Sequence, residues 1–393
     1  MKRVLFVCHD ASRTGAPLML LWLLRGLLAH QAVEAHVAIL RDGPLRDDFA
    51  ALCPTETWRP FQPTPWQQRL AAKVSRRPLS VDPDAWLAEI VERVRPDVLY
   101  LNTLVVGYAL GRMAPQHVPP AVISHVHELE PSLALMSRPE LVQRQLAMST
   151  LVLACAEPVR AYLVAHHQVP PERCALLPEG FPLAMAQPLD PSTFDPQTRA
   201  VVQAMAEEKA KGTFLFGCLG SPISRKGFDL FPLLLRACAD LFGDLPFRGV
   251  WVGCGDGSAA QASVLWDLQR LGLEQRALVL PGLPKGPAAI AQLDVFTLLS
   301  REDPFPIVVL EAGAQGIPTI CFQGSGGIPD LARREAVVAV PYLDLQAFAG
   351  ELHQLARQPE ERRRLGQRCH DLVLAEHTVE HLVPQLERLI ERA

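Results

Sequence analysis

The chain has 393 residues, of which 49% are hydrophobic and 20% are charged. Because a single hydrophobic core stops growing at roughly 250–300 residues, this length predicts two domains of similar size. The 38 basic and 42 acidic residues give a formal net charge of -4, which argues against a dedicated nucleic-acid-binding protein. The 35 prolines are spread along the chain, so they do not indicate a disordered sequence.

The cysteines and the apolar segments bear on the cellular compartment. Nine cysteines are scattered along the chain and none forms a C-x-x-C pair, which predicts reduced thiols. Val4–Cys8 is too short for a signal peptide, and Pro17–Leu28 is shorter than the roughly 20 residues of a membrane span. We therefore expect a cytoplasmic protein, either soluble or peripheral at the inner face of a membrane.

In the first half, short β-branched runs alternate with longer helical segments. After the strand Val4–Cys8, the segment Ala16–Ala29 is apolar nearly all round, which predicts a helix packed on most of its faces. This alternation predicts βαβ units with parallel strands. The further strands expected in this half are Val33–Leu40, Asp97–Asn102, Ala121–Val126, Thr150–Ala154 and Cys174–Leu177.

The proline-rich segment Pro182–Gly212 interrupts the rhythm, and we interpret it as the connection between the domains. Its second part, Val201–Lys211, has a polar, helix-like pattern. Beyond it, continuous apolar runs return, as is typical of parallel strands buried on both faces. The strands expected in the second half are Thr213–Leu219, Gly249–Val252, Ala277–Leu280, Val295–Leu299, Thr319–Phe322 and Val337–Val340.

The sequence thus predicts an α/β protein with two doubly wound, Rossmann-like parallel-sheet domains that face each other across a cleft. We place the first domain at residues 1–185 and the second at residues 186–377. Open α/β sheets bind ligands at the carboxyl ends of their strands, so the expected site is the cleft.

Ser300–Pro318 is the segment with the strongest functional pattern. Pro304 and Pro306 suit the start of a helix from about Pro306 to Gln315, whose first turn favours a phosphate. Glu311 stands on this helix among apolar residues, where an ionised carboxylate is costly without a partner. Glu311 is either a salt-bridged interior residue or the acceptor of hydrogen bonds from two vicinal hydroxyls of a ribose.

Two further pairs of residues are candidates for chemistry. Arg225 and Lys226 precede a predicted helix, and they are either a solvated basic pair or the site of an anion that relieves their conflict with the helix dipole. Such cations can neutralise a bound anion without a metal. His125 and His127 share one face of a strand. They are a metal pair without an evident third ligand, core histidines, or a pair in which His127 belongs to an active site.

Taken together, these segments resemble the retaining GT-B glycosyltransferases of family four. The resemblance extends across most of the chain and rests on the order and spacing of its motifs. At the first acidic position of the family's E-x7-E pattern stands Asp303, with Glu302 beside it, so either carboxylate could face the donor sugar. The segments that carry the resemblance are His9–Gly15, Ile123–Glu128, Pro178–Phe181, Leu219–Ser221, Arg225–Leu230, Val252–Gly257, Leu280–Leu283 and Ser300–Pro318.

The resemblance implies the GT-B fold and a hexosyltransferase that moves a sugar, with retention, from a UDP- or GDP-linked donor to a glycan, lipid-linked or small-molecule acceptor. It implies no metal and no cofactor beyond the donor, and a C-terminal helix at about 378–393 that packs back on the first domain. The catalytic residues implied are His127, Asp303, Arg225 and Lys226. The donor-binding residues implied are Gly15, Gly220, Ser221, Arg225, Lys226, Glu302, Asp303, Phe305, Pro306, Ile307 and Glu311.

Other functions remain as alternatives at this point. One is a GT-B epimerase or phosphorylase, although no lysine is a clear candidate for pyridoxal phosphate. Another is a non-catalytic nucleotide-sugar-binding partner protein, which the aspartate at 303 favours. Gly253–Gly257 is weak evidence for NAD, because Ser258 replaces the third glycine of the dinucleotide fingerprint.

Aromatic and basic residues alternate between Trp58 and Arg77. This segment either lies on an anionic membrane surface and helps to fetch a lipid-linked acceptor, or forms a solvated loop and helix. The residues concerned are Trp58, Arg59, Phe61, Trp66, Arg69, Lys73, Arg76 and Arg77.

Overall fold

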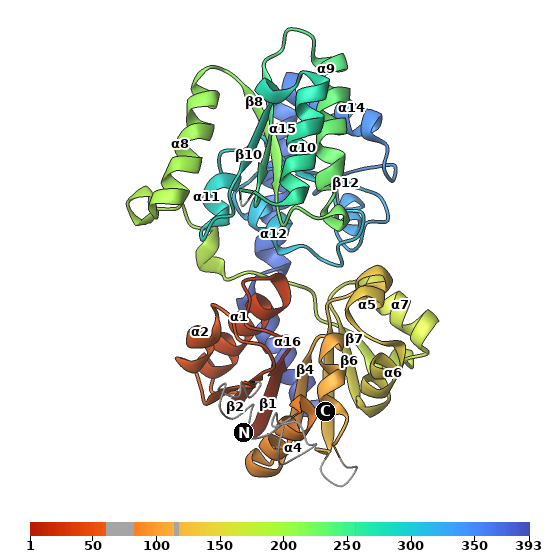
Figure 1. Cartoon of the computed structure of the whole chain (residues 1–393). Coiled ribbons are helices and arrows are strands. Elements are labelled where there is room, and N and C mark those ends of the chain that lie inside the picture. Colours follow the sequence, from red (N-terminus) through yellow and green to blue (C-terminus); the bar gives the residue numbers. More distant parts are fainter. Residues whose placement is uncertain (60–81, 114–117, 256) are drawn as a thin grey trace, which may run out of the picture. The chain divides into compact units, whose positions relative to one another are not determined.

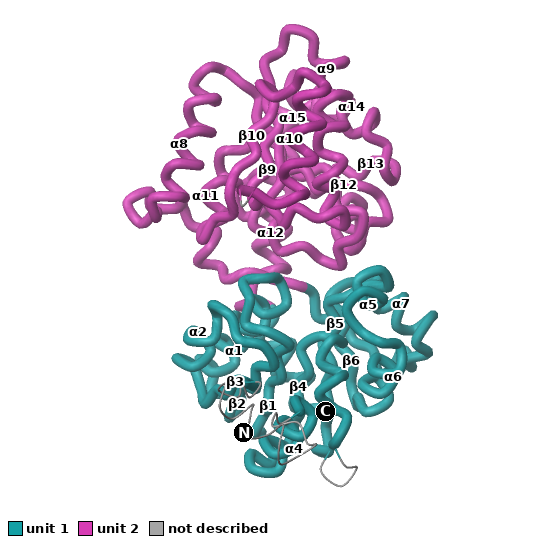
Figure 2. The backbone as a smooth tube through the Cα atoms, viewed as in Figure 1, with its two compact units in different colours: residues 1–178, 382–393 teal, residues 179–381 magenta. Residues whose placement is uncertain are grey.

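The computed structural model describes residues 1–59, 82–113, 118–255 and 257–393. They divide into two compact units, of which unit 1 comprises residues 1–178 and 382–393 and unit 2 comprises residues 179–381 (Figures 1 and 2). Each unit has its own parallel sheet flanked by helices, so the predicted α/β class with two parallel-sheet domains is confirmed. None of the helices in these ranges is both long and apolar enough to cross a membrane.

Unit 1 contains a sheet in the order β3-β2-β1-β4-β5-β6-β7, in which every neighbouring pair is parallel. The central strands are continuous apolar runs because helices cover both of their faces. The edge strand β3 was not predicted, since its three residues lack an apolar run. The strands are β1 Lys2–Cys8, β2 Val33–Ile39, β3 Thr55–Thr57, β4 Val98–Asn102, β5 Ala121–Val126, β6 Leu151–Ala154 and β7 Cys174–Leu176. The helices described in the first segment of unit 1 are α1 Gly15–Ala29, α2 Arg46–Ala50, α4 Pro83–Val94, α5 Glu130–Met136, α6 Pro139–Met148 and α7 Glu157–His167.

Unit 2 repeats this plan with a sheet in the order β10-β9-β8-β11-β12-β13, again parallel throughout. Its helices pack in pairs, α9 against α14 and α12 against α15. The strands are β8 Phe214–Leu219, β9 Phe247–Val252, β10 Ala277–Leu280, β11 Val295–Leu298, β12 Thr319–Phe322 and β13 Val338–Val340. The helices described in unit 2 are α8 Pro196–Ala210, α9 Phe231–Phe242, α10 Ala259–Leu271, α11 Gly286–Ile290, α12 Ile307–Ala314, α13 Pro329–Ala332, α14 Leu345–Arg357 and α15 Pro359–Glu376.

The observed division differs from the predicted one at the first crossing of the chain, which lies between residues 178 and 179 rather than 185 and 186. Phe181 is fully buried, and its backbone exchanges hydrogen bonds with residues at the other crossing: Phe181 N–H donates to His377 O at 3.0 Å, and Val379 N–H donates to Phe181 O at 3.0 Å. These bonds make the segment after Pro178 part of unit 2.

The interpretation of Pro182–Gly212 as an interdomain connection is wrong for the same reason. This segment belongs to unit 2, and most of its second part is α8, which packs against α11. Asp195 caps α8 by accepting hydrogen bonds from the backbone N–H groups of Gln197 and Thr198, each at 3.0 Å. The prolines before α8 therefore shape a surface segment of one unit.

The last helix, α16 Val379–Arg392, begins in unit 2, and its residues from Leu382 onward belong to unit 1. Its buried side chains in unit 1 include Leu386 and Ile390. A side chain at Gly26 of α1 would overlap Val383, because a Cβ atom there would lie 2.4 Å from Val383 Cγ2. Lys2 Nζ donates hydrogen bonds to the carbonyls of Ile390 and Glu391, each at 3.0 Å. The N-terminal strand and the C-terminal helix thus hold each other in unit 1.

Candidate donor-binding site in unit 2

The candidate residues of unit 2 follow the two strands at which the order of the sheet reverses. β8 and β11 are neighbours in the sheet, but the chain goes from β8 to one side and from β11 to the other. Their following loops therefore diverge at the carboxyl edge, which is where open α/β sheets bind ligands. We call residues 220–230, which follow β8, the basic loop, and residues 299–306, which follow β11, the acidic loop.

The two cations and two carboxylates singled out in the sequence lie together at this point. The Lys226 ammonium donates a hydrogen bond to Asp303 Oδ2, and the Ser300 hydroxyl donates to the same oxygen at 3.1 Å. Arg225 Nη1 lies 3.9 Å from Asp303 Oδ1 and 3.8 Å from Glu302 Oε2. Both carboxylates are buried, whereas both cations keep part of their surface exposed. The cluster thus presents positive charge outward and negative charge inward.

Arg225 and Lys226 are not at a helix start, which removes the dipole argument made from the sequence. They occupy a short 3₁₀ turn, Ser224–Lys226, and α9 begins only at Phe231. Gly227 ends this turn with φ +78°, a conformation that favours glycine. The partners of the two cations are the carboxylates of the acidic loop and the backbone carbonyl of Glu302, to which Arg225 Nη1 donates at 2.9 Å.

A third segment fixes the acidic loop and was not predicted. Asp303 N–H donates to Ser325 O at 2.6 Å, and Gly327 N–H donates to Pro304 O at 2.8 Å. Gly326 has φ +142°, and a Cβ atom there would lie 1.7 Å from Asp303 O. Only glycine fits such a close approach. The signal available in the sequence was the run Gly324-Ser325-Gly326-Gly327.

Helix α12 carries Glu311 and begins at Ile307, with Pro306 as its N-cap, as the two prolines predict. The Glu311 carboxyl is half-buried, and burial raises its pKa to about 7. In the ranges that the structure describes, no cation forms a salt bridge with it, which favours the interpretation as a ribose-binding residue over that of a salt-bridged interior residue. A half-buried carboxylate of this kind is suited to accept hydrogen bonds from a ligand.

The other expected donor-binding residues of unit 2 lie on the same loops, apart from Ile307, which begins α12. Gly220 O accepts a hydrogen bond from Trp251 Nε1 at 3.0 Å, and Ser221 is exposed at the start of the basic loop. The Phe305 ring stacks on the ring of His377 with their centres 5.1 Å apart. The Ile307 side chain is buried, so only its backbone is available to a ligand.

In unit 1, His125 and His127 stand at the end of β5 and differ in their surroundings. His125 is fully buried; its Nδ1 lies 2.8 Å from the Tyr100 hydroxyl and its Nε2 lies 3.4 Å from Leu177 O. Because both ring nitrogens are engaged, a metal pair of His125 and His127 is not supported, and His125 is a core histidine. His127 is half-buried, and burial, with a smaller contribution from His9, lowers its pKa to about 3.

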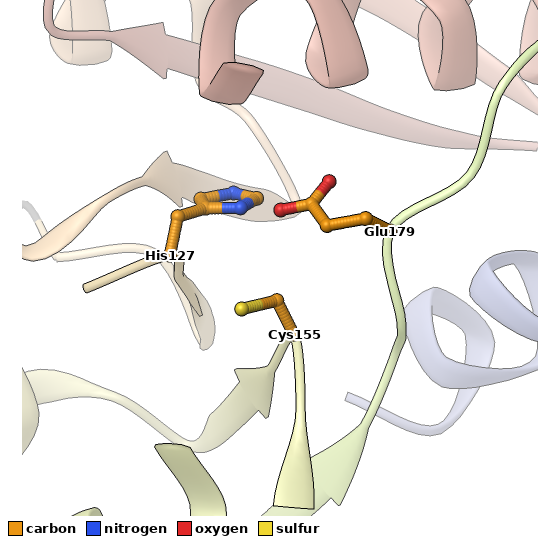
Figure 3. A group of neighbouring side chains, drawn as sticks. All are labelled: His127, Cys155 and Glu179. Atoms are coloured by element: carbon orange, nitrogen blue, oxygen red, sulfur yellow. The ribbon is translucent and has the colours of Figure 1, made fainter. Parts of the chain in front are cut away.

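The His127 ring is held by Asn102 at the end of β4. Its Nε2 lies 3.0 Å from Asn102 Oδ1, and Asn102 Nδ2 donates to Ala16 O, next to Gly15 at the start of α1, at 3.0 Å. His127 also lies beside Cys155 (Figure 3), with a ring nitrogen within 4.8 Å of the thiol sulfur. Glu179, drawn with them, is the first residue of unit 2. A His–Cys pair supplies two of the four ligands that a structural zinc site needs.

The aromatic and basic residues from Phe61 to Arg77 lie outside the described residues, and so does Asp256 in the segment 253–257.

Comparison with curated proteins gives a match to part of the chain. A curated relative, the N-acetyl-alpha-D-glucosaminyl L-malate synthase of Bacillus anthracis, is 29% identical over 136 residues, which are 34% of this chain and 35% of that protein. The alignment therefore spans about a third of the length of that relative.

Two solved structures have the same fold over essentially their full length. The Anabaena protein HepE in complex with UDP-glucose has a TM-score of 0.77 at 17% identity and covers 100% of both chains. The sucrose-phosphate synthase of Thermosynechococcus elongatus has a TM-score of 0.76 at 18% identity and covers 100% of this chain and 99% of its own.

Two family models match adjacent parts of the sequence. The model described as Glycosyltransferase Family 4 matches residues 15–184, and the model described as glycosyl transferases group 1 matches residues 204–370. Together they cover most of the chain and meet near the boundary between the two units. The chain therefore belongs to the group 1 glycosyltransferases of family 4 and has their GT-B fold.

Proposed function

We propose that this glycosyltransferase moves a hexosyl group from a UDP- or GDP-linked donor, with retention of configuration, to a glycan, lipid-linked or small-molecule acceptor. The observation that carries the proposal is the cluster at the carboxyl ends of β8 and β11. There, Arg225 and Lys226 expose positive charge next to the buried carboxylates of Glu302 and Asp303.

The cluster suits a diphosphate leaving group. When the bond between the sugar and the diphosphate breaks, negative charge develops on the phosphate oxygens, and two fixed cations stabilise it. A hydrogen bond to a charged group contributes about 1.5–3 kcal/mol, so each cation accounts for roughly tenfold or more in rate. The donor phosphates would compete with Asp303 for Lys226. The released carboxylate would then accept a hydrogen bond from a hydroxyl of the transferred sugar.

Glu311 supplies the complementary contact at the nucleoside end of the donor. Its half-buried carboxyl is suited to accept hydrogen bonds from the two hydroxyls of a ribose, a group that every nucleotide donor carries. The solved UDP-glucose complex of HepE, which shares the fold, supports a uridine nucleotide as the first donor to examine.

His127 is proposed to act on the acceptor side as a neutral imidazole. Burial lowers its pKa to about 3, so the ring stays uncharged at neutral pH and contributes hydrogen bonds to hydroxyl groups. Retention is proposed to follow from a front-face reaction, in which the leaving phosphate helps to deprotonate the acceptor, rather than from a carboxylate nucleophile. A metal is not needed for this scheme, because Arg225 and Lys226 provide the positive charge.

The experiment that tests the proposal is titration of the protein with UDP and GDP by calorimetry, followed by hydrolysis and transfer assays with UDP- and GDP-sugars. Saturable binding of one nucleotide together with release of sugar from its donor is expected. Binding without turnover across acceptor pools would favour the alternative of a non-catalytic nucleotide-sugar-binding partner. Absence of binding to both nucleotides would contradict the proposal.

A further inference from the structure

Arg301 connects the acidic loop to the basic loop. Its guanidinium donates to both carboxylate oxygens of Asp229, each at 2.8 Å. The same side chain donates to Ser224 O at 2.6 Å and to Ser224 Oγ at 3.1 Å. Its backbone N–H donates to Arg225 O at 2.8 Å. One residue of the acidic loop therefore contacts the basic loop on both sides of Lys226.

The backbone hydrogen bonds within the basic loop are local and close its short turns. It consists of short 3₁₀ turns, within which Lys226 N–H donates to Ile223 O at 3.0 Å and Gly227 N–H donates to Ser224 O at 2.9 Å. At Gly227 the loop lies directly against the first residue of the acidic loop, because a Cβ atom there would be 2.1 Å from Leu299 O. The turn that carries the two cations is thus held against the acidic loop from both sides.

The geometry requires arginine rather than any cation. A guanidinium presents several N–H donors in a rigid plane and can bind a carboxylate with two parallel hydrogen bonds while still donating to a carbonyl. Lysine carries the same charge on a single flexible ammonium and cannot reproduce this fork. Asp229 is about half exposed, so the charge attraction by itself contributes little to stability. The main effect of Arg301 is therefore to fix geometry.

We propose that Arg301 is a positioning residue for donor binding. It holds Ser224 and Asp229 so that Arg225 and Lys226 already lie beside Glu302 and Asp303 before a diphosphate arrives. Arg301 acts through these two cations and does not itself contact the donor. Such preorganisation strengthens binding because the loop loses less conformational freedom on binding. The inference rests on the proposed function, since it takes the basic loop as the phosphate site.

The test compares Arg301→Lys with Arg364→Lys as a matched control. Arg364 on α15 also makes two 2.8 Å hydrogen bonds to one carboxylate, that of Glu361, but on a different part of the chain. For each full-length variant we would measure hydrogen–deuterium exchange of peptides covering residues 221–230, UDP and GDP affinity by calorimetry, and the melting temperature. Arg301→Lys should speed exchange in this peptide. It should also weaken nucleotide binding about tenfold, the loss expected when one charged hydrogen bond from Arg225 or Lys226 to the phosphates is not formed. Arg364→Lys should change neither.

A double-mutant cycle with Asp229→Asn identifies the partner. If Arg301 and Asp229 act as one unit, the affinity lost in the double variant should be close to that of the single variants rather than their sum. Unchanged exchange in Arg301→Lys, or faster exchange with unchanged affinity, would overturn the role of Arg301. Failure of the unchanged protein to bind UDP or GDP would instead contradict the proposed function. The two failures can be told apart, because the exchange measurement tests the effect of Arg301 on the loop without any nucleotide.

Discussion

The ammonium of Lys226 donates a hydrogen bond to the carboxylate of Asp303. The residue expected to bind the donor phosphates is therefore paired with the residue expected to bind the donor sugar. Ser300 and Arg225 complete the surroundings of the same carboxylate. When a donor binds, this hydrogen bond must break so that Lys226 contacts the phosphate and Asp303 contacts the sugar. A substitution at either residue is therefore expected to change the hydrogen bonds of the other residue as well as the contact with the donor.

Lys226→Ala is expected to lower donor hydrolysis about tenfold or more, because one contact to the leaving diphosphate is lost. It should also lower the melting temperature, since it leaves the buried Asp303 carboxylate without its closest cation. Adding Asp303→Asn should restore part of the stability but none of the activity. Thermal denaturation and a hydrolysis assay measure both effects on the unchanged protein, the two single variants and the double variant. A double variant no more stable than Lys226→Ala would contradict the pairing.

Glu311→Ala is expected to reduce UDP or GDP affinity more than Asp303→Asn does. Glu311 is proposed to bind the ribose, which is present in the free nucleotide, whereas Asp303 is proposed to bind the sugar, which is absent from it. Calorimetric titration with the nucleotide alone separates the two. Equal losses in both variants would refute the assignment of these carboxylates.

The pKa of Glu311 predicts a pH dependence of nucleotide affinity. Burial raises this pKa to about 7, and ribose hydroxyls donate hydrogen bonds to the ionised form, so binding should lower the pKa and release a proton. Affinity is therefore expected to rise from pH 6 to pH 8 and then level off. The nucleotide phosphate also titrates, with a pKa near 6. Glu311→Gln serves as the control, because its pH profile should retain only the phosphate contribution.

The same raised pKa has a consequence for stability, with the opposite dependence on pH. The folded protein favours the protonated carboxyl, while the unfolded chain ionises above about pH 4.5, so stability declines as pH rises from there through about 7. Glu311→Gln removes this decline. The melting temperature of the variant, relative to the unchanged protein, should increase between pH 5 and pH 8. A constant difference would show that burial does not control this carboxyl.

Gly326→Ala is expected to displace the acidic loop. A Cβ atom at this position would lie 1.7 Å from Asp303 O, and φ is +142°. Gly324, with φ +72° and no atom within 4 Å of the added Cβ, is the control, because its substitution introduces backbone strain alone. Gly326→Ala should lower the melting temperature by several degrees more than Gly324→Ala and should weaken nucleotide binding. Equal effects would show that the contact with Asp303 is unimportant.

Much of the fold could be predicted because buried parallel strands leave continuous apolar runs. Each expected strand begins and ends within two residues of an observed strand. The edge strand Thr55–Thr57 has no such run, and no local pattern marks it. The connection was misplaced because prolines indicate a break in regular structure without indicating to which unit the break belongs.

The candidate site was only partly predictable from the sequence. Arg225, Lys226 and Asp303 could be chosen by motif, but the pairing of Lys226 with Asp303 spans 77 residues. It depends on β8 and β11 being neighbours in the sheet. Arg301 escaped notice for the same reason, since its contacts with Ser224 and Asp229 exist only once these strands are side by side. Glu311 was correctly placed on a helix, yet only the structure shows its half-buried carboxyl without an ion pair in the described chain.

Strand β1 and the last turn of α16 are both in unit 1, where Lys2 bonds to Ile390 and Glu391. In topological terms unit 2 is an insertion within unit 1, entered after Pro178 and left before Leu382. Deletion of α16 would therefore remove a helix from unit 1, most of which is synthesised before unit 2. During translation, unit 1 can complete its fold only after unit 2 has left the ribosome, so unit 2 has all of its residues available before unit 1 does.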